Sequence, residues 1–352
     1  MTKRSLFGRL VAGAFLSAAV VLWAFPAAGQ TTRPAEGLGG PHSVETLLLE
    51  WNDPQRNRQV PVKIYYPADG GGKSPVIIFS HGLGGSREGY AYLGREWASH
   101  GYVSVHVQHV GSDDQVWRDV PAAERMAAMR KAAVNLSNIL NRPRDISFVI
   151  DQLQKLNEEA GPLKGRLDLD RIGAAGHSFG AYTTQAVIGE RFFPGGREAS
   201  MGDPRIKAAV IMSPNAPKDK TQDDAAFAKI IVPCLHMTGT LDDSPIGDTK
   251  AADRRVAFDH TPATSDQFLI IFTGGDHMIF SGRPRRLALP GAAESPDKDA
   301  RFQEKIRKET TTFWDAYLRG DESARKWMTD GDAKQFLGDL GTFEIKLKGQ
   351  SK

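Results

Sequence analysis

The sequence predicts an α/β fold, with helices on both faces of a mostly parallel central sheet. Apolar, β-rich stretches alternate with amphipathic helical segments through most of the chain, which is the pattern of parallel sheets. Several of these stretches, such as Val76–Phe79, are apolar at every position, as expected for strands that are buried on both faces. The chain of 352 residues is 40% hydrophobic and can bury a full core. We therefore expect one domain over residues 43–348.

The first 29 residues have the form of a secretory signal peptide. Basic residues come first, an apolar run follows, and small residues stand where a signal peptidase would cut: Lys3, Arg4 and Arg9, then Leu10–Phe25, then Ala27 and Gly29. The apolar run is shorter than the roughly 20 residues of a membrane-spanning helix, which favours cleavage over an uncleaved anchor. We predict a signal peptide over 1–29, a flexible lead-in over 30–42, and export to the periplasm or the extracellular space without stable membrane insertion.

Charge and cysteine content exclude several classes of protein. The formal net charge of +3 is supplied by the three basic residues of the predicted signal, which contains no acidic residue. The mature chain therefore has no basic surplus to hold nucleic acid, and a small-molecule substrate is the expected partner. Cys234 is the only cysteine, so no intrachain disulfide can form, and its apolar neighbours predict a buried strand residue.

No cofactor or metal is expected from the motifs. Pro67 stands where a phosphate-binding loop ending at Lys73 would need its first glycine, and Arg87 stands where a dinucleotide fingerprint starting at Gly82 would need its third. The histidine, cysteine and aspartate residues show no metal-ligand spacing. Chemistry that needs only the side chains of the chain is therefore favoured.

The first half of the chain supplies an edge pair, two central strands and an insertion. Val44–Trp51 and Val60–Tyr66 are predicted to pair as an antiparallel edge, since apolar residues alternate along the second stretch. Val76–Phe79 and Tyr102–Val107 are predicted strands, joined by a helix over Glu88–His100. Residues 109–141, with a helical piece over Ala122–Leu140, are predicted to form a small insertion over the site.

The second half continues the alternation of helices and strands. Ile146–Leu156 has apolar residues at helical spacing and is predicted to pack on the sheet. Further strands and a helix are predicted at Ile172–Ala175, Ile206–Met212, Ile230–Met237, Phe268–Phe272 and Ala300–Leu318, followed by a C-terminal extension over about 320–348.

Gly176-His177-Ser178-Phe179-Gly180 has the spacing of a nucleophile elbow between a strand and a helix. A serine on such a strained turn projects its hydroxyl outward, and the turn closes only if the residues two before and two after have no side chain. The Phe179 N–H lies at the start of the helix, where no intrahelical acceptor reaches it, and can point at a developing oxyanion. The motif predicts Ser178 as a nucleophile.

A serine nucleophile needs a base, and the base needs an acid to fix its tautomer. Of the three histidines after Ser178, His236 lies within a predicted strand and His260 within a polar stretch, whereas His277 follows a strand and two glycines. We predict His277 as the base. Asp242, which follows a strand, is the predicted acid, with Asp243 and Asp276 as alternatives.

The remaining site residues follow from their places at strand ends. Gly82-Leu83-Gly84 allows close approach of the backbone, so the Leu83 N–H is the predicted second oxyanion donor. The pocket is predicted to include Trp117 and, just beyond the histidine, Met278 and Phe280. His81 is either a pocket residue or a core histidine that stabilises the turn, and His109 either contacts substrate or is solvated.

Four features together resemble the α/β-hydrolases of the platelet-activating-factor acetylhydrolase and dienelactone-hydrolase-like group. They are Phe79-Ser80-His81-Gly82-Leu83-Gly84, Ala98-Ser99-His100-Gly101-Tyr102, the elbow and the late His277. The resemblance spans about Val60 to Leu318. It implies the α/β-hydrolase fold, a triad of Ser178, Asp242 and His277, an oxyanion hole from Leu83 and Phe179, and metal-independent hydrolysis of carboxylic esters. Dienelactone hydrolases proper use a cysteine nucleophile. The serine in this chain departs from that pattern, which argues against lactone hydrolysis.

The function predicted from the sequence is therefore an exported serine esterase that works through an acyl-enzyme and prefers short acyl chains. A peptidase or amidase on the same triad is one alternative, although the insertion over residues 109–141 is small for peptide selection. A binding protein that kept the fold without the chemistry is the other. An assay of the pure mature protein on a short-chain aryl ester would do most to separate the three.

Overall fold

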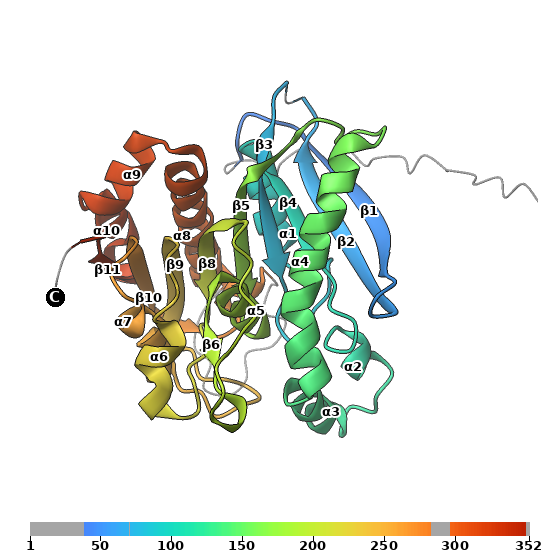
Figure 1. Ribbon diagram of the computed structural model, residues 1–352. Coiled ribbons are helices and arrows are strands. Elements are labelled where there is room, and N and C mark those ends of the chain that lie inside the picture. The colour runs from blue at the N-terminus through green and yellow to red at the C-terminus, as the bar shows by residue number, and fades with distance from the viewer. Residues whose placement is uncertain (1–38, 70, 283–295, 350–352) are drawn as a thin grey trace, which may run out of the picture.

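The computed structural model describes residues 39–69, 71–282 and 296–349. Within them a nine-stranded sheet runs in the order β1-β2-β4-β3-β5-β8-β9-β10-β11 (Figure 1). The strands are β1 Val44–Asp53, β2 Arg58–Pro67, β3 Ser74–Ser80, β4 Val103–Val107, β5 Leu167–His177, β8 Ile206–Met212, β9 Cys234–Leu241, β10 Gln267–Asp276 and β11 Gly341–Lys346. The predicted signal peptide and residues 30–38 of the lead-in lie outside the described residues.

The centre of the sheet is parallel and its edges are antiparallel. The strands β4, β3, β5, β8, β9 and β10 pair in parallel. At one edge β1 pairs antiparallel with β2, and β2 pairs antiparallel with β4. At the other edge β11 is antiparallel to β10. The prediction of a mostly parallel sheet with an antiparallel N-terminal pair is therefore confirmed.

Helices cover both faces of the sheet (Figure 1). They are α1 Ala91–Ser99, α2 Gln115–Arg118, α3 Arg125–Ala133, α4 Leu136–Glu158, α5 Phe179–Ile188, α6 Asp223–Phe227, α7 Val256–His260, α8 Pro296–Trp314, α9 Glu322–Thr329 and α10 Asp332–Leu337. Every residue of β3 is buried, and its apolar side chains alternate between two core clusters. Val76 and Ile78 pack with α4 and α5 on one face, whereas Ile77 and Phe79 pack with α1 and α8 on the other.

The helices around residues 122–158 differ from the prediction. The helical piece expected over Ala122–Leu140 is broken, because Asn135 caps a new helix by accepting the N–H groups of Ser137 and Asn138. That helix, α4, continues as one element to Glu158. It contains Pro143, which leaves the Ile139 carbonyl without its helical donor. The Tyr182 hydroxyl donates to this carbonyl instead, at 3.2 Å.

Several strand boundaries also differ, and two of them lie next to the site. The strand predicted over Ile230–Met237 begins only at Cys234 and extends to Leu241, since Pro233 has no N–H to contribute to the sheet. The last central strand, β10, extends to Asp276, with an irregularity in its pairing between Phe272 and Asp276. Both extensions bring the strand ends directly to Asp242 and His277.

Candidate active site

Ser178 lies on a sharp turn between β5 and α5. Its backbone has φ 58° and ψ −116°, in the positive-φ region that non-glycine residues rarely adopt. A Cβ atom on Gly176 would lie 2.2 Å from the Gly180 carbonyl oxygen, and one on Gly180 would lie 1.9 Å from the Ser80 carbonyl oxygen. Both glycines are therefore required by close backbone approach, which is the steric condition for the elbow.

Replacing Gly180 with alanine is expected to destabilise the fold severely. The added methyl group would meet backbone atoms of β3 and of the following turn, which cannot move as a flexible side chain can. The expected loss exceeds the roughly 1–3 kcal/mol of ordinary overpacking, and thermal unfolding of the purified variant measures it. Gly161→Ala is the matched control, because nothing lies within 4 Å of the added Cβ atom. A Gly180→Ala protein with the Tm of the Gly161→Ala protein would contradict the steric account.

His277 lies between Ser178 and Asp242. Its Nε2 atom is 2.9 Å from Ser178 Oγ, and its Nδ1 atom is 2.7 Å from Asp242 Oδ1. Asp242 is fully buried, and its other carboxylate oxygen accepts a hydrogen bond of 2.8 Å from the Thr238 hydroxyl. Because a carboxylate only accepts, the proton of this pair lies on Nδ1, which leaves Nε2 free to accept the serine proton. The arrangement can move a proton from the serine hydroxyl to the imidazole.

The other acids and histidines considered from the sequence point elsewhere. Asp243 is paired with Lys250 Nζ at 3.0 Å and accepts the Ala251 N–H. Asp276 accepts the N–H of Met278 at 2.9 Å. The two remaining histidines are also engaged: His236 Nε2 is 3.2 Å from Gln267 Oε1, and His260 Nδ1 is 2.6 Å from Asp224 Oδ1.

Arg254 supports the acid from a position that the sequence analysis missed. Its guanidinium is buried and lies 3.6 Å from Asp242 Oδ1. It also donates to the Asp242 carbonyl at 3.1 Å and to the carbonyls of Ser213 and Pro214 at 3.1 and 3.0 Å. These contacts fix the turn after β9 against the turn after β8. Arg254 and Arg255 stand side by side in a charged segment, and nothing in the sequence distinguishes the one that faces the site.

Leu83 and Phe179, the two residues predicted to supply oxyanion donors, both line the pocket. Phe179 is the first residue of α5, where an amide has no intrahelical acceptor. Within the described part of the chain neither N–H donates to another backbone group outside the helices and strands. The carbonyl of the Ser178–Phe179 peptide accepts a hydrogen bond of 3.1 Å from the Asn215 side chain, so Asn215, also missed from the sequence, fixes the orientation of the Phe179 amide.

A pocket of about 1380 Å³ opens over Ser178 and His277. Its walls include the predicted Trp117 and Met278, together with Leu83, Phe179 and Tyr182. The insertion supplies one side with both apolar and basic groups, namely Arg125, Met126, Met129, Arg130, Ala133, Val134 and Ile139. The mainly apolar walls suit an organic substrate with few polar groups.

Three residues predicted for the pocket do not line it. His81 and His109 are buried behind the turn after β3, where His81 Nδ1 hydrogen-bonds the Gly82 carbonyl and His109 lies between Ser80 and Asp145. Phe280 turns into the core and packs against Phe272, at 6.1 Å between ring centroids. The pocket assignments of these three residues were therefore wrong, and for His81 the alternative of a core histidine that stabilises the turn is correct.

Among the described residues no group of three or more His, Cys, Asp or Glu side chains is placed to hold a metal ion. In the same residues no helix has the length and apolar character to cross a membrane.

Comparisons with known proteins find a family model and relatives that match part of the chain. Residues 44–124 match the family model described as platelet-activating factor acetylhydrolase, isoform II. The platelet-activating factor acetylhydrolase of Cavia porcellus is 32% identical over 44% of this chain and 38% of its own length, and that of Canis lupus familiaris is 30% identical over 41% and 36%. Cutinase 2 of Thermobifida cellulosilytica is 25% identical over 43% of each chain.

The matches thus span about two fifths of the length of these curated relatives. The family model covers the first four strands of the sheet and ends before the turn at Ser178. The fold is consistent with the α/β-hydrolase fold, and the matched part of the chain is similar to the platelet-activating factor acetylhydrolases.

Proposed function

We propose that the protein is a serine hydrolase of carboxylic esters, with Ser178 as nucleophile, His277 as base and Asp242 as the acid that orients it. The observation that carries the proposal is the single imidazole within hydrogen-bond distance of both the serine hydroxyl and a buried carboxylate. The relatives are named for ester hydrolysis, as acetylhydrolases and cutinases. Hydrolysis of a short aryl ester by the pure protein, abolished by Ser178→Ala, tests it.

In the proposed mechanism His277 Nε2 accepts the Ser178 proton as Oγ attacks the ester carbonyl carbon. The carbonyl oxygen gains negative charge, which the N–H groups of Leu83 and Phe179 stabilise. Imidazolium His277, held by Asp242, returns the proton to the departing alcohol and leaves an acyl group on Ser178. A water molecule then repeats the sequence, with His277 as its base, and releases the acid.

The positive φ of Ser178 has a role in this mechanism. It directs the hydroxyl out of the sheet toward His277 and brings the following amide to the same side. The buried histidine next to the nucleophile, His177, does not compete as a base. Burial, His277 and Arg254 hold the pKa of His177 well below its usual value, so its ring is a weak base, and its Nδ1 atom lies 2.7 Å from the Tyr90 hydroxyl.

The proposed substrates are soluble esters with acyl chains of about two to six carbons. Each buried CH₂ contributes only about 0.8 kcal/mol, so a pocket that fits a small acyl group selects by shape rather than by area. A volume of about 1380 Å³ exceeds what such a chain needs, which leaves space for a bulkier alcohol part. An aryl-ester series from acetate to palmitate should give the highest kcat/KM at the short end, with long-chain triglycerides and peptides poor.

A maximum of kcat/KM at long chains, or activation at a lipid interface, would contradict this preference. The matched control is the same series with Ser178→Ala, which reports spontaneous and adventitious hydrolysis at each chain length. The relatives named acetylhydrolase act on an acetyl ester, the shortest acyl group in the series.

We further propose export after cleavage of the segment over residues 1–29, and one domain over 43–348. The basic start, the apolar run and the small residues Ala27 and Gly29 support the signal. Protein isolated from its host should begin at or near Gln30, as N-terminal sequencing would measure. Mature material that retains Met1 in a membrane fraction would contradict it.

A further inference from the structure

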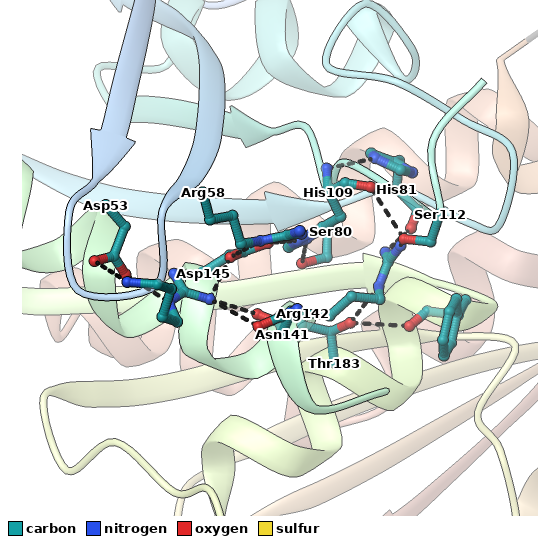
Figure 2. A network of polar contacts seen from close by, with 12 residues as sticks. Asp53, Arg58, Ser80, His81, His109, Ser112, Asn141, Arg142, Asp145 and Thr183 are labelled. Carbon is teal, nitrogen blue, oxygen red and sulfur yellow. Dashed lines mark hydrogen bonds and ion pairs between the residues drawn. The ribbon is translucent and has the colours of Figure 1, made fainter. Parts of the chain in front are cut away.

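A buried arginine links the two halves of the proposed oxyanion hole. Arg142, on α4, is fully buried and donates three hydrogen bonds through its guanidinium (Figure 2). Nη2 donates to the His81 carbonyl, Nη1 to Ser112 Oγ at 2.8 Å, and Nε to Thr183 Oγ1 at 2.9 Å. The three acceptors lie on three segments: the turn after β3, the turn after β4, and helix α5.

The turn after β3 carries the Leu83 amide, and its orientation is fixed from one side by His81. Gly82 C=O and Leu83 N–H belong to one planar peptide, so a bond that holds the carbonyl also aims the N–H. His81 Nδ1 donates to this carbonyl at 2.6 Å, and His81 Nε2 accepts the His109 N–H at 3.2 Å. The two partners therefore fix the His81 tautomer. Burial and the nearby Arg142 hold the pKa of His81 well below its usual value, which keeps the ring neutral.

The same turn is held by the segment after β4. Gly84 N–H donates to the Ser112 carbonyl at 2.9 Å, and Ser112 Oγ is itself an Arg142 acceptor. The other side of the oxyanion hole is held by α5, where the Thr183 hydroxyl donates to the Phe179 carbonyl at 3.0 Å and accepts from Arg142. The guanidinium also lies over the Phe179 ring, 4.6 Å from its centroid.

Arg142 has no carboxylate partner that would explain its burial. Within the described residues it forms no ion pair with an acid. Asp145, whose charge acts on it, is paired with Arg56, Arg58 and His109, and Figure 2 shows Arg58 and His109 beside this carboxylate. Burial lowers the pKa of Arg142 to about 9. An unpaired buried cation is costly, and an apolar side chain of similar volume would fill the space at lower cost.

We propose that Arg142 is a positioning residue of the oxyanion hole, which fixes the Leu83 amide of the β3 turn relative to the Phe179 amide of α5. This inference rests on the proposed ester hydrolysis at Ser178. A planar fork with donors in three directions suits three acceptors on three segments, and lysine, with a single ammonium group, cannot reach all three. Arg142 touches no reacting atom. It acts through the His81–Gly82 peptide and, by way of Thr183, through the Phe179–Gly180 peptide, each of which adjoins the peptide that carries an oxyanion N–H.

The test compares Arg142→Lys, Arg142→Met and Thr183→Val with the wild type. A fully lost oxyanion donor costs about 10²- to 10³-fold in kcat, so a misaimed donor should cost about 10- to 100-fold in the two arginine variants and several-fold in Thr183→Val. KM should change by less than about threefold, since ground-state binding does not use the aimed amide. Arg205→Met is the matched control: Arg205 pairs with Asp151 and Asp203 next to the start of β8, at the opposite end of the strand from the site.

The inhibition constant of an aryl boronic acid distinguishes a positioning role of Arg142 from a merely structural one. Its adduct with a serine is tetrahedral and anionic, so its inhibition constant should rise by the same factor as kcat falls. Valine has about the same volume as threonine. The Thr183→Val variant therefore tests the proposal if Arg142→Met does not fold. Wild-type kcat and boronate affinity in both Arg142→Lys and Thr183→Val would overturn the inference, as would a loss confined to KM or to Tm. Failure of the proposed function is distinct, because then Ser178→Ala would match the wild type on the ester.

Discussion

Ser178→Ala is expected to lower kcat/KM for a short aryl ester by about 10⁵- to 10⁶-fold, as the loss of a triad nucleophile does. His277→Ala is expected to be about as damaging, because without a base the Ser178 hydroxyl at 2.9 Å from the imidazole is a poor nucleophile. The two residues act as one unit, so the double variant should be no worse than either single one. Steady-state kinetics with active-site titration of the wild type measure these ratios.

Two control variants separate the loss of chemistry from damage to the fold. Ser200→Ala changes an exposed serine on the short strand β7 (Ala199–Ser200), and His260→Ala changes a histidine that is paired with Asp224 at the surface. Both should retain activity within about twofold. A Ser178→Ala enzyme with more than a few per cent of the wild-type kcat would exclude Ser178 as the nucleophile.

Asp242→Asn is expected to cost about 10³- to 10⁴-fold in kcat, somewhat less than the loss of Ser178, because the imidazole remains in reach. The amide can present its NH₂ group to His277 Nδ1, which favours the tautomer with the proton on Nε2, where no serine proton can be accepted. The fully buried position of Asp242 gives water no access to replace the carboxylate.

Asp243→Asn is the matched control, one residue along the chain. Asp243 is exposed and pairs with Lys250 Nζ, so its variant should keep kcat within about twofold. If Asp243→Asn were the damaging change and Asp242→Asn were not, the assignment of the acid would be wrong by one position. The ratio of the two kcat values decides between them.

The elbow and the sheet could be predicted because their causes are local in the sequence. The turn at Ser178 leaves no room for a side chain two residues before or two residues after the serine, so glycine is required at positions 176 and 180. The structure shows the clashes that a Cβ atom would make at both positions. The alternation of apolar strands with helices likewise follows from burial on both faces of the sheet, as the division of β3 between two cores shows.

The supporting polar residues could not be predicted, because their partners are distant in the chain. Arg142 meets the His81 carbonyl 61 residues away, and Arg254 meets the Ser213 carbonyl 41 residues away. Neither contact produces a recognisable spacing of residues in the sequence. Asp242 was preferred over Asp243 as the acid, but the sequence could not exclude Asp243, since two neighbouring aspartates after a strand differ only in the direction in which they face.

His81 and His109 were misassigned to the pocket for a related reason. A histidine at a strand end faces the ligand or the turn, and here hydrogen bonds to Gly82 and Asp145 fix the second orientation.

The most direct test of the proposed acyl-enzyme mechanism is the site of covalent labelling by a fluorophosphonate. The reagent should modify the folded protein at one position, and mass spectrometry of the digested adduct should place it on Ser178, in the peptide that contains Gly176 and Gly180. Labelling should be lost in Ser178→Ala and strongly slowed in His277→Ala. An adduct on another serine, or undiminished labelling of Ser178→Ala, would contradict the assignment of Ser178 as the nucleophile.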